Sequence, residues 1–141
     1  MRIGGTEIYV RDVGEGPPVL LLNGIGAHVE MWRPLERALE GVRVISFDAP
    51  GTGRSETRMV PLTMHGLARL AVRLLDELEV VQADVVGYSF GGALAQEVAV
   101  QARDRLRRLV LAATFPGWGG VPGHLTAMLS LMTPLRYYSR S

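Results

Sequence analysis

The chain has 141 residues, of which 48% are hydrophobic and 21% are charged, and its formal net charge is +1. This length allows at most one domain, and the composition is that of a packed globular α/β protein, which excludes a disordered chain. The absence of cysteine excludes a disulfide framework and a cysteine-ligated metal site, and no pattern in the sequence implies a metal or an organic cofactor.

The distribution of charged and apolar residues excludes further classes. All 14 acidic residues lie at or before Asp104, and the basic residues, all of them arginine, are scattered along the chain. A nucleic-acid site would need a basic patch with interleaved aromatic residues, so we expect no nucleic-acid partner. No apolar run is long enough to span a membrane and no apolar secretory segment opens the chain, so we expect a cytoplasmic protein.

Apolar patterns predict three strands and a helix in the first third of the chain. Residues 7–13 alternate and end in a turn rich in Gly and Pro, which predicts an outer strand. Residues 19–22 form a short continuous apolar run, as expected for a strand buried on both faces. A helix is predicted over 31–39, with a second core strand over 42–47.

The second part of the chain continues the alternation. Leucine and alanine recur at helical spacing from Leu67 to Leu78, and Thr63 is placed to cap the helix that they predict. A strand, a helix and a last strand follow, over residues 84–87, 91–103 and 108–113. Strands that alternate with helices favour a parallel, doubly wound sheet.

Residues 87–91, Gly-Tyr-Ser-Phe-Gly, match the pattern G-x-S-x-G between an apolar strand and a helix. In this arrangement the serine is exposed on a tight turn, and a side chain at Gly87 or Gly91 would strike the neighbouring strand or helix. The helix N-terminus places amides and a positive dipole end near a developing oxyanion. We therefore expect Ser89 to be a nucleophile; the alternative is a glycine-rich turn without chemistry.

A second loop supplies the remaining part of an oxyanion hole. It follows the strand 19–22 with the sequence Asn-Gly-Ile-Gly, where a loop can aim a backbone N–H at the site. We expect the amide of Phe90, directly after the nucleophile, and an amide of this loop, that of Ile25, to be the two donors. Asn23 and Gly24 would support them. Alone, the loop is equally consistent with a flexible connection.

The partners of the serine are harder to find. The three histidines are His28, His65 and His124. His65 lies at the start of an amphipathic helix, where we expect it to be solvated, and His124 opens a last predicted helix over 124–131 that could lie over the site. His28 follows the oxyanion loop and is the nearest candidate base, but each is more often an ordinary surface or loop histidine. No candidate acid follows Ala113.

Two further residues are interpreted as structural. Asp48 stands in an Asp-x-Pro-Gly sequence, and a carboxylate that caps nearby amides explains it better than a role as the triad acid. Trp32 and the leucine stripe are interpreted as core residues and not as ligand contacts.

Four motifs together resemble the amino-terminal half of α/β-hydrolases. They are Asn-Gly-Ile-Gly-Ala at 23–27, Phe-Asp-Ala-Pro-Gly-Thr-Gly-Arg-Ser at 47–55, Gly-Tyr-Ser-Phe-Gly-Gly at 87–92 and Leu-Val-Leu-Ala-Ala-Thr at 109–114. Within that superfamily the nearest resemblance is to intracellular poly(3-hydroxyalkanoate) depolymerases, which also carry Asn-Gly-Ile-Gly-Ala. Phe90 is a departure, because those depolymerases usually have tryptophan after the nucleophile.

The resemblance implies an α/β-hydrolase fold with a mostly parallel, doubly wound sheet, truncated after the sixth strand and the start of the lid. Residues 1–116 would be the amino-terminal half of the core and 117–141 the beginning of the lid. The family places its acid and histidine after the lid, so both would be missing from this chain. The strand 108–113 would form an exposed apolar edge, which favours a complementing chain or a homo-oligomer.

The resemblance also implies a function. It is a serine carboxylic ester hydrolase that acts on aliphatic hydroxyalkanoate esters or polyesters, associated with polyester granules where the substrate is polymeric. Alternatives of the same fold are a lactonase and a small-ester esterase. A different class is a non-catalytic, truncated paralogue that binds a granule or a partner through its apolar edge.

Overall fold

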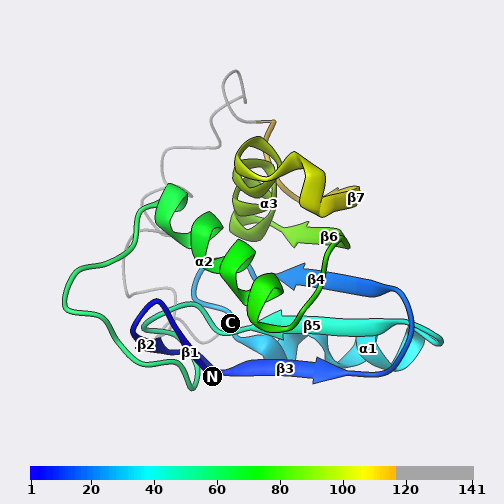
Figure 1. The fold of residues 1–141 in the computed structure, drawn as a ribbon, viewed down its shortest axis with the longest axis horizontal. Coiled ribbons are helices and arrows are strands. Elements are labelled where there is room, and N and C mark those ends of the chain that lie inside the picture. The colour runs from blue at the N-terminus through cyan, green and yellow to red at the C-terminus, as the bar shows by residue number, and fades with distance from the viewer. Residues whose placement is uncertain (117–141) are drawn as a thin grey trace, which may run out of the picture.

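The computed structural model describes residues 1–116, which form a twisted sheet with helices on both faces (Figure 1). The central sheet has the strand order β3-β5-β4-β6-β7. Its strands are β3 (Val10–Val13), β4 (Pro18–Leu22), β5 (Arg43–Phe47), β6 (Ala83–Tyr88) and β7 (Leu106–Ala112). All neighbours are parallel except β3, which pairs antiparallel with β5. The predicted parallel, doubly wound sheet is therefore confirmed.

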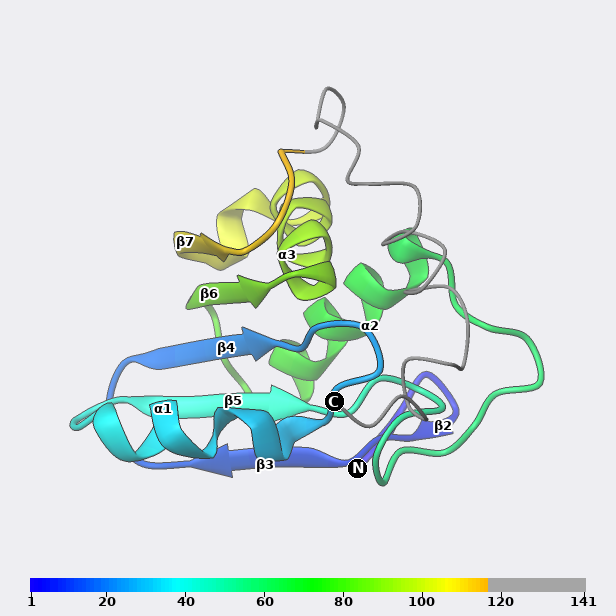
Figure 2. The same ribbon diagram turned by 180° about the vertical axis from the view of Figure 1, so that it is seen from behind.

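The remaining elements are two layers of helices and a small hairpin. The hairpin is β1 (Arg2–Ile3) and β2 (Thr6–Glu7). The helices are η1 (Val29–Trp32), α1 (Arg33–Ala38), α2 (Met64–Glu77), α3 (Phe90–Gln101) and η2 (Arg103–Arg105). Figure 2 shows α1 lying over β5 on one face of the sheet, while α2 and α3 lie on the other. No helix within residues 1–116 is long and apolar enough to cross a membrane.

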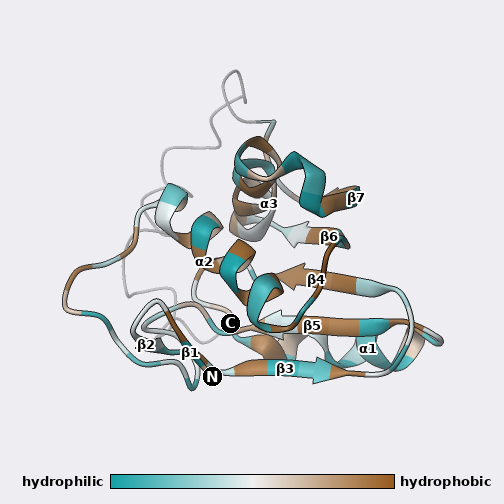
Figure 3. Ribbon diagram, in the orientation of Figure 1, coloured by the Kyte–Doolittle hydropathy of each residue, from teal (hydrophilic) through white to brown (hydrophobic). Residues whose placement is uncertain are grey.

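The core is divided by the sheet into two parts, because side chains of a strand alternate between its faces. On β4, Leu20 and Leu22 belong to the larger cluster under α2 and α3, whereas Val19 and Leu21 belong to a smaller cluster with Trp32. The prediction that this strand is buried on both faces is confirmed, as is the interpretation of Trp32 as a core residue. In Figure 3, β4 and β5 are largely hydrophobic.

Helix α2 forms as its sequence predicts. Thr63 is the N-cap, and its hydroxyl accepts a hydrogen bond from the Gly66 amide at 3.1 Å. The leucine stripe faces the sheet, with Leu74 and Leu75 fully buried. In Figure 3, α2 alternates between hydrophobic and hydrophilic bands, as an amphipathic helix does.

The strand predicted over 7–13 is divided in two in the structure. Its start belongs to the β1–β2 hairpin, and only its end pairs with β5. Between the two, the Ile8 amide donates to the Met1 carbonyl at 2.8 Å and the Tyr9 amide donates to Ser55 Oγ at 2.9 Å. These hydrogen bonds take the backbone away from the central sheet, which is why one continuous strand does not form.

The helix predicted over 31–39 also has different bounds. It begins as the 3-10 turn η1, and the regular helix α1 starts only at Arg33. Pro34 lies in the first turn of α1, where its missing N–H does no harm and its fixed φ suits a helix start. The helix predicted over 124–131 and the predicted lid segment lie outside the described residues.

Strand β7 is one edge of the central sheet. Its side chains are unusually open for apolar residues: Leu109 is 39%, Val110 51% and Leu111 41% exposed. The prediction of an exposed apolar edge at this strand is confirmed. An edge of this kind presents unpaired backbone groups and apolar surface to any further strand.

Candidate active site

Ser89 connects β6 to α3 in a backbone conformation that side chains rarely adopt. Its φ is 54° and its ψ is −117°, close to the first central position of a type II′ turn. The neighbouring backbone holds it there: the Ser89 amide donates to the Ala112 carbonyl of β7 at 2.9 Å, and the Gly92 amide donates to the Ser89 carbonyl at 2.9 Å. Strained backbone that the surroundings fix in this way is typical of functional sites.

The two glycines that flank the serine lie where no side chain fits. A Cβ atom at Gly87 would come 2.3 Å from the Gly91 carbonyl oxygen, and one at Gly91 would come 2.0 Å from the Leu22 carbonyl oxygen. Both distances are far below van der Waals contact. Helix α3 therefore starts directly against the end of β4, and this close approach sets the sharp angle at Ser89.

The loop between β4 and η1 lies beside the serine and is anchored at both ends. A Cβ atom at Gly24 would be 3.7 Å from that of Ser89. At the start of the loop, Asn23 Nδ2 donates to the Phe47 carbonyl at 3.0 Å, and Asn23 Oδ1 accepts from Trp32 Nε1 at 2.6 Å. Both polar atoms of the Asn23 side chain are thus hydrogen-bonded, and the side chain supports the loop. Periodicity alone did not indicate that the Trp32 indole would take part in this support.

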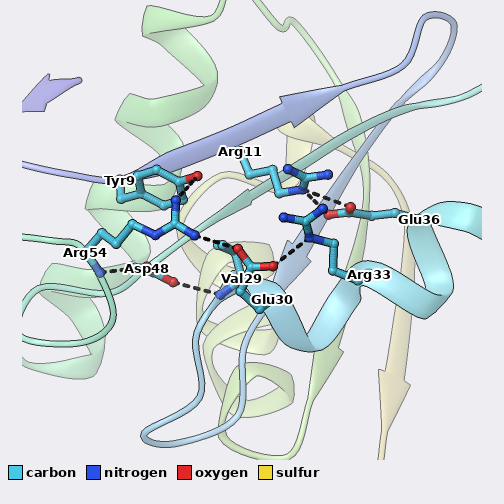
Figure 4. A network of polar contacts seen from close by, with 8 residues as sticks. All are labelled: Tyr9, Arg11, Val29, Glu30, Arg33, Glu36, Asp48 and Arg54. Atoms are coloured by element: carbon cyan, nitrogen blue, oxygen red, sulfur yellow. Dashed lines mark hydrogen bonds and ion pairs between the residues drawn. The ribbon is translucent and has the colours of Figure 1, made fainter.

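The far end of this loop is fixed by Asp48, which is 1% exposed (Figure 4). Its Oδ1 accepts from the Val29 amide at 2.7 Å, and its Oδ2 accepts from the Arg54 amide at 2.9 Å. The interpretation of Asp48 as a carboxylate that caps amides is confirmed. Because both oxygens are engaged with backbone amides, Asp48 orients two loops, whereas a triad acid would accept from the histidine base.

Ion pairs outside Asp48 brace the same region (Figure 4). Glu30 accepts from Arg33 Nε and from Arg54 Nη2, each at 2.6 Å. The hydrogen bond from Arg33 and the charges of both arginines lower the pKa of Glu30. The Arg54 guanidinium also lies 4.2 Å from the centre of the Tyr9 ring and donates to its hydroxyl at 2.7 Å. The segment before β3, η1, the start of α1 and the loop after β5 are thereby held together.

The two amides expected to bind an oxyanion have no hydrogen-bond acceptor in the part of the chain that the structure describes. Within residues 1–116, neither the Ile25 nor the Phe90 amide donates a hydrogen bond. Phe90 is the first residue of α3, so its N–H has no partner inside the helix. Both residues line one small apolar cavity of about 100 Å³, together with side chains that include Phe47, Leu67 and Leu94.

The fold and the elbow have counterparts among known proteins. A model of the α/β-hydrolase fold family matches residues 17–130. The chain belongs to the α/β-hydrolase family. It is 44% identical over 125 residues to a poly(3-hydroxyalkanoate) depolymerase of Ectopseudomonas oleovorans. The aligned residues cover 88% of this chain and 44% of that protein. This α/β-hydrolase chain therefore spans less than half the length of that relative.

Solved structures agree on the fold. The enol-lactonase of Burkholderia xenovorans matches this α/β-hydrolase with a TM-score of 0.77 at 33% identity, over 81% of this chain and 46% of that one. A hydrolase of Pseudomonas aeruginosa matches with a TM-score of 0.79 at 32% identity, over 94% of this chain and 49% of that one. The resemblance to α/β-hydrolases that four sequence motifs predict is confirmed.

Within residues 1–116 of this α/β-hydrolase, neither histidine is hydrogen-bonded to Ser89. His28 lines a different cavity, with Glu30, Asp48 and Arg54, and not the cavity of Ile25 and Phe90. His124 lies outside the described residues.

His65 is exposed on α2, as predicted, and its Nδ1 lies 3.1 Å from Glu97 Oε1 on α3. Hydrogen bonds from Gln101 and from His65 lower the pKa of Glu97. The pair joins two helices at the surface. Within residues 1–116 there is also no group of three side chains that could hold a metal ion.

Proposed function

We propose that this chain carries the nucleophile and the oxyanion hole of a serine ester hydrolase. The observation that carries the proposal is the conformation of Ser89, which a tight turn between β6 and α3 presents beside an anchored loop. A strained serine at the carboxyl end of a parallel strand, followed by a helix N-terminus, is the arrangement of a nucleophile elbow. Its position at the strand end is also where open α/β sheets bind ligands.

The proposed reaction is acyl transfer through Ser89. Its Oγ attacks the ester carbonyl, and the amides of Ile25 and Phe90 bind the resulting oxyanion. The serine proton passes to a base and then to the leaving alcohol, which gives an acyl-enzyme that water hydrolyses. We propose that the base and the acid that orients it come from outside residues 1–116, because the described histidines lie elsewhere.

For the substrate, we propose an aliphatic hydroxyalkanoate ester or polyester. The 44% identity to a poly(3-hydroxyalkanoate) depolymerase supports this class. The cavity at Ile25 and Phe90 is lined by aliphatic and aromatic side chains, which suits an alkyl chain better than a charged or sugar substrate. On this proposal the protein acts in the cytoplasm, at the surface of polyester granules.

A second candidate is a lactonase or an esterase of small substrates, favoured by the 33% identity to an enol-lactonase. Fold alone does not choose between them. Hydrolysis rates on hydroxyalkanoate oligomers, a lactone and short p-nitrophenyl esters separate the two. A rate on oligomers at least about tenfold above the others supports the first candidate, and the reverse order supports the second.

The test of the nucleophile is intact-mass spectrometry after treatment with a fluorophosphonate. In the protein with its base in place, we expect one adduct on the wild type, none on Ser89→Ala, and one on Ser55→Ala, a matched loss of a serine hydroxyl elsewhere. An adduct that persists in Ser89→Ala would reject Ser89 as the nucleophile. No adduct on any form, with granule binding retained in Ser89→Ala, would favour the non-catalytic alternative.

A further inference from the structure

Three arginines line a cavity between α2 and the β1–β2 hairpin. Arg69 and Arg73 are one turn apart on α2, and Arg58 comes from the loop before that helix. The cavity has a volume of about 180 Å³ and is lined by Ile3, Gly4, Arg58, Leu62, Gly66, Arg69, Leu70 and Arg73. Among the described residues, no acidic side chain contributes to its lining.

The charge of these arginines is not compensated within residues 1–116. There, none of the three has a carboxylate within ion-pair distance. Several other arginines do have a carboxylate partner: Arg43 is paired to Asp12 at 2.6 Å, and Arg107 to Asp84 at 2.8 Å. A cavity rimmed by three such cations has a positive potential that an anion would lower.

Arg58 is the most firmly placed of the three. Its Nη1 donates to the buried Thr6 hydroxyl at 2.5 Å, which fixes the side chain against the β1–β2 hairpin. Its Nε is buried, and within the described residues it has no hydrogen-bond partner.

The β1–β2 hairpin forms the wall that faces α2, and the buried part of the cavity is apolar. Gly4 has a φ of +56°, and a Cβ atom there would lie 3.0 Å from Arg73 Nη1. The hairpin turn thus comes close to this guanidinium. Ile3 and Leu70 are 2% and 5% exposed and form an apolar floor. The site combines guanidinium groups at its mouth with a small hydrophobic base.

We propose that this cavity binds the phosphate group of a small phosphorylated organic molecule. Guanidinium groups bind phosphate with paired, charge-assisted hydrogen bonds. A phosphate monoester carries a charge of about −1.5 to −2 at pH 7, which offsets three arginines better than a single carboxylate does. The apolar floor accommodates the organic substituent. The proposal does not depend on the hydrolase function.

Helix α2 contributes residues both to this cavity and to the cavity of Ile25 and Phe90. Leu67 lines the cavity of Ile25 and Phe90, whereas Gly66 and Leu70 line the arginine cavity. The two ligand sites would therefore lie on adjacent faces of α2.

The experiment is a titration of the whole 141-residue chain with phenyl phosphate, inorganic phosphate and hexanoate at constant ionic strength. Calorimetry gives the affinities, and the arginine Nε–Hε signals in ¹⁵N NMR spectra locate the ligand. We expect phenyl phosphate to bind most tightly and to shift the arginine signals. Arg58→Gln and Arg73→Gln should each weaken its binding by about tenfold or more, the loss typical of one charged hydrogen bond.

Arg103→Gln is the matched control, since it removes the same charge from exposed η2 without touching the cavity. Circular dichroism melts establish that each variant is folded. Equal weakening by the control would mean a diffuse charge effect, and hexanoate binding as tightly as phenyl phosphate would reject phosphate as the ligand group. A wild-type titration in which no arginine signal moves would overturn the site itself.

Discussion

The indole Nε1 of Trp32 donates a hydrogen bond of 2.6 Å to Oδ1 of Asn23, the first residue of the loop beside the candidate nucleophile. Trp32 is 7% exposed, so one side chain serves both the core and the loop. The other amide atom of Asn23 is held by the Phe47 carbonyl. The position of the Ile25 amide therefore depends on the packing of a core tryptophan.

Replacement of Trp32 by phenylalanine should separate these two roles. Phenylalanine keeps most of the apolar contact but leaves Asn23 Oδ1 without its donor, so we expect a loss of unfolding free energy of about 1–2 kcal/mol in urea titrations. In the active protein, kcat should fall while KM changes little, since the oxyanion is held only in the transition state. An unchanged kcat with lowered stability would limit Trp32 to a packing role.

Glycine substitutions should have opposite effects at two positions. Gly91→Ala places a Cβ atom 2.0 Å from a backbone oxygen of β4, and we expect a destabilisation of about 3 kcal/mol. Gly66→Ala is the matched control within α2, where the new methyl comes closest to the flexible end of Leu62 at 3.3 Å and meets Thr63 Oγ1 at 3.5 Å. There we expect stabilisation of up to about 1 kcal/mol from helix propensity. Chemical denaturation measures both; a neutral Gly91→Ala would contradict the close approach of α3 to β4.

The ion pair between Asp84 on β6 and Arg107 on β7 should make the unfolding free energy depend on pH in the acid range. Arg107 on β7 donates to both carboxylate oxygens of Asp84 on β6 at 2.8 Å, and this hydrogen bonding lowers the pKa of Asp84 below its ordinary 3.8. A lowered pKa stabilises the folded state above the ordinary value, and the contribution is lost as the pH falls below it. As the pH falls below 3.8, we expect the unfolding free energy of Asp84→Asn to decrease less than that of the wild type. Urea titrations at several pH values measure both.

Asp104→Asn is the control for this pH dependence, because Asp104 makes no ion pair within residues 1–116. Its pH profile should match that of the wild type. A slope below pH 3.8 that is the same in all three proteins would show that the Asp84–Arg107 pair contributes nothing to folding.

The apolar edge should mediate association. Val110 is 51% exposed in the middle of β7, and we expect Val110→Lys to shift the protein toward monomer, because a charged edge strand resists pairing with another strand. Sedimentation velocity over a range of concentrations measures the effect. Val100→Lys, at an 81% exposed position of α3, is the control and should leave association unchanged. A wild-type protein that stays monomeric at high concentration would disprove association through this edge.

The features that sequence reasoning predicted are those set by residues close together in the chain. The cap at Thr63, the apolar stripe of α2 and the buried strand predicted over 19–22 each follow from local patterns. The serine turn is recognisable for the same reason. The place of the last strand at an edge follows from the resemblance to a known fold.

The features that were not predicted depend on side chains that only the fold brings together. Arg58 is 11 residues before Arg69 in sequence, and nothing in the spacing places it at the same cavity. The hydrogen bond between Tyr9 and Ser55, which interrupts the expected first strand, joins residues 46 positions apart. Likewise, no local pattern around Trp32 indicated that its indole would donate a hydrogen bond to Asn23.

The amide of Ser89 is bound to the Ala112 carbonyl, so the backbone angle of the nucleophile is fixed by the end of β7. This one amide proton is consequently a reporter of the sheet edge, since its exchange with solvent requires the end of β7 to open. Any chain that pairs with β7 and suppresses its fraying would slow this exchange and narrow the range of serine orientations. Association at this edge and the orientation of Ser89 would then both depend on one equilibrium, the opening and closing of the end of β7.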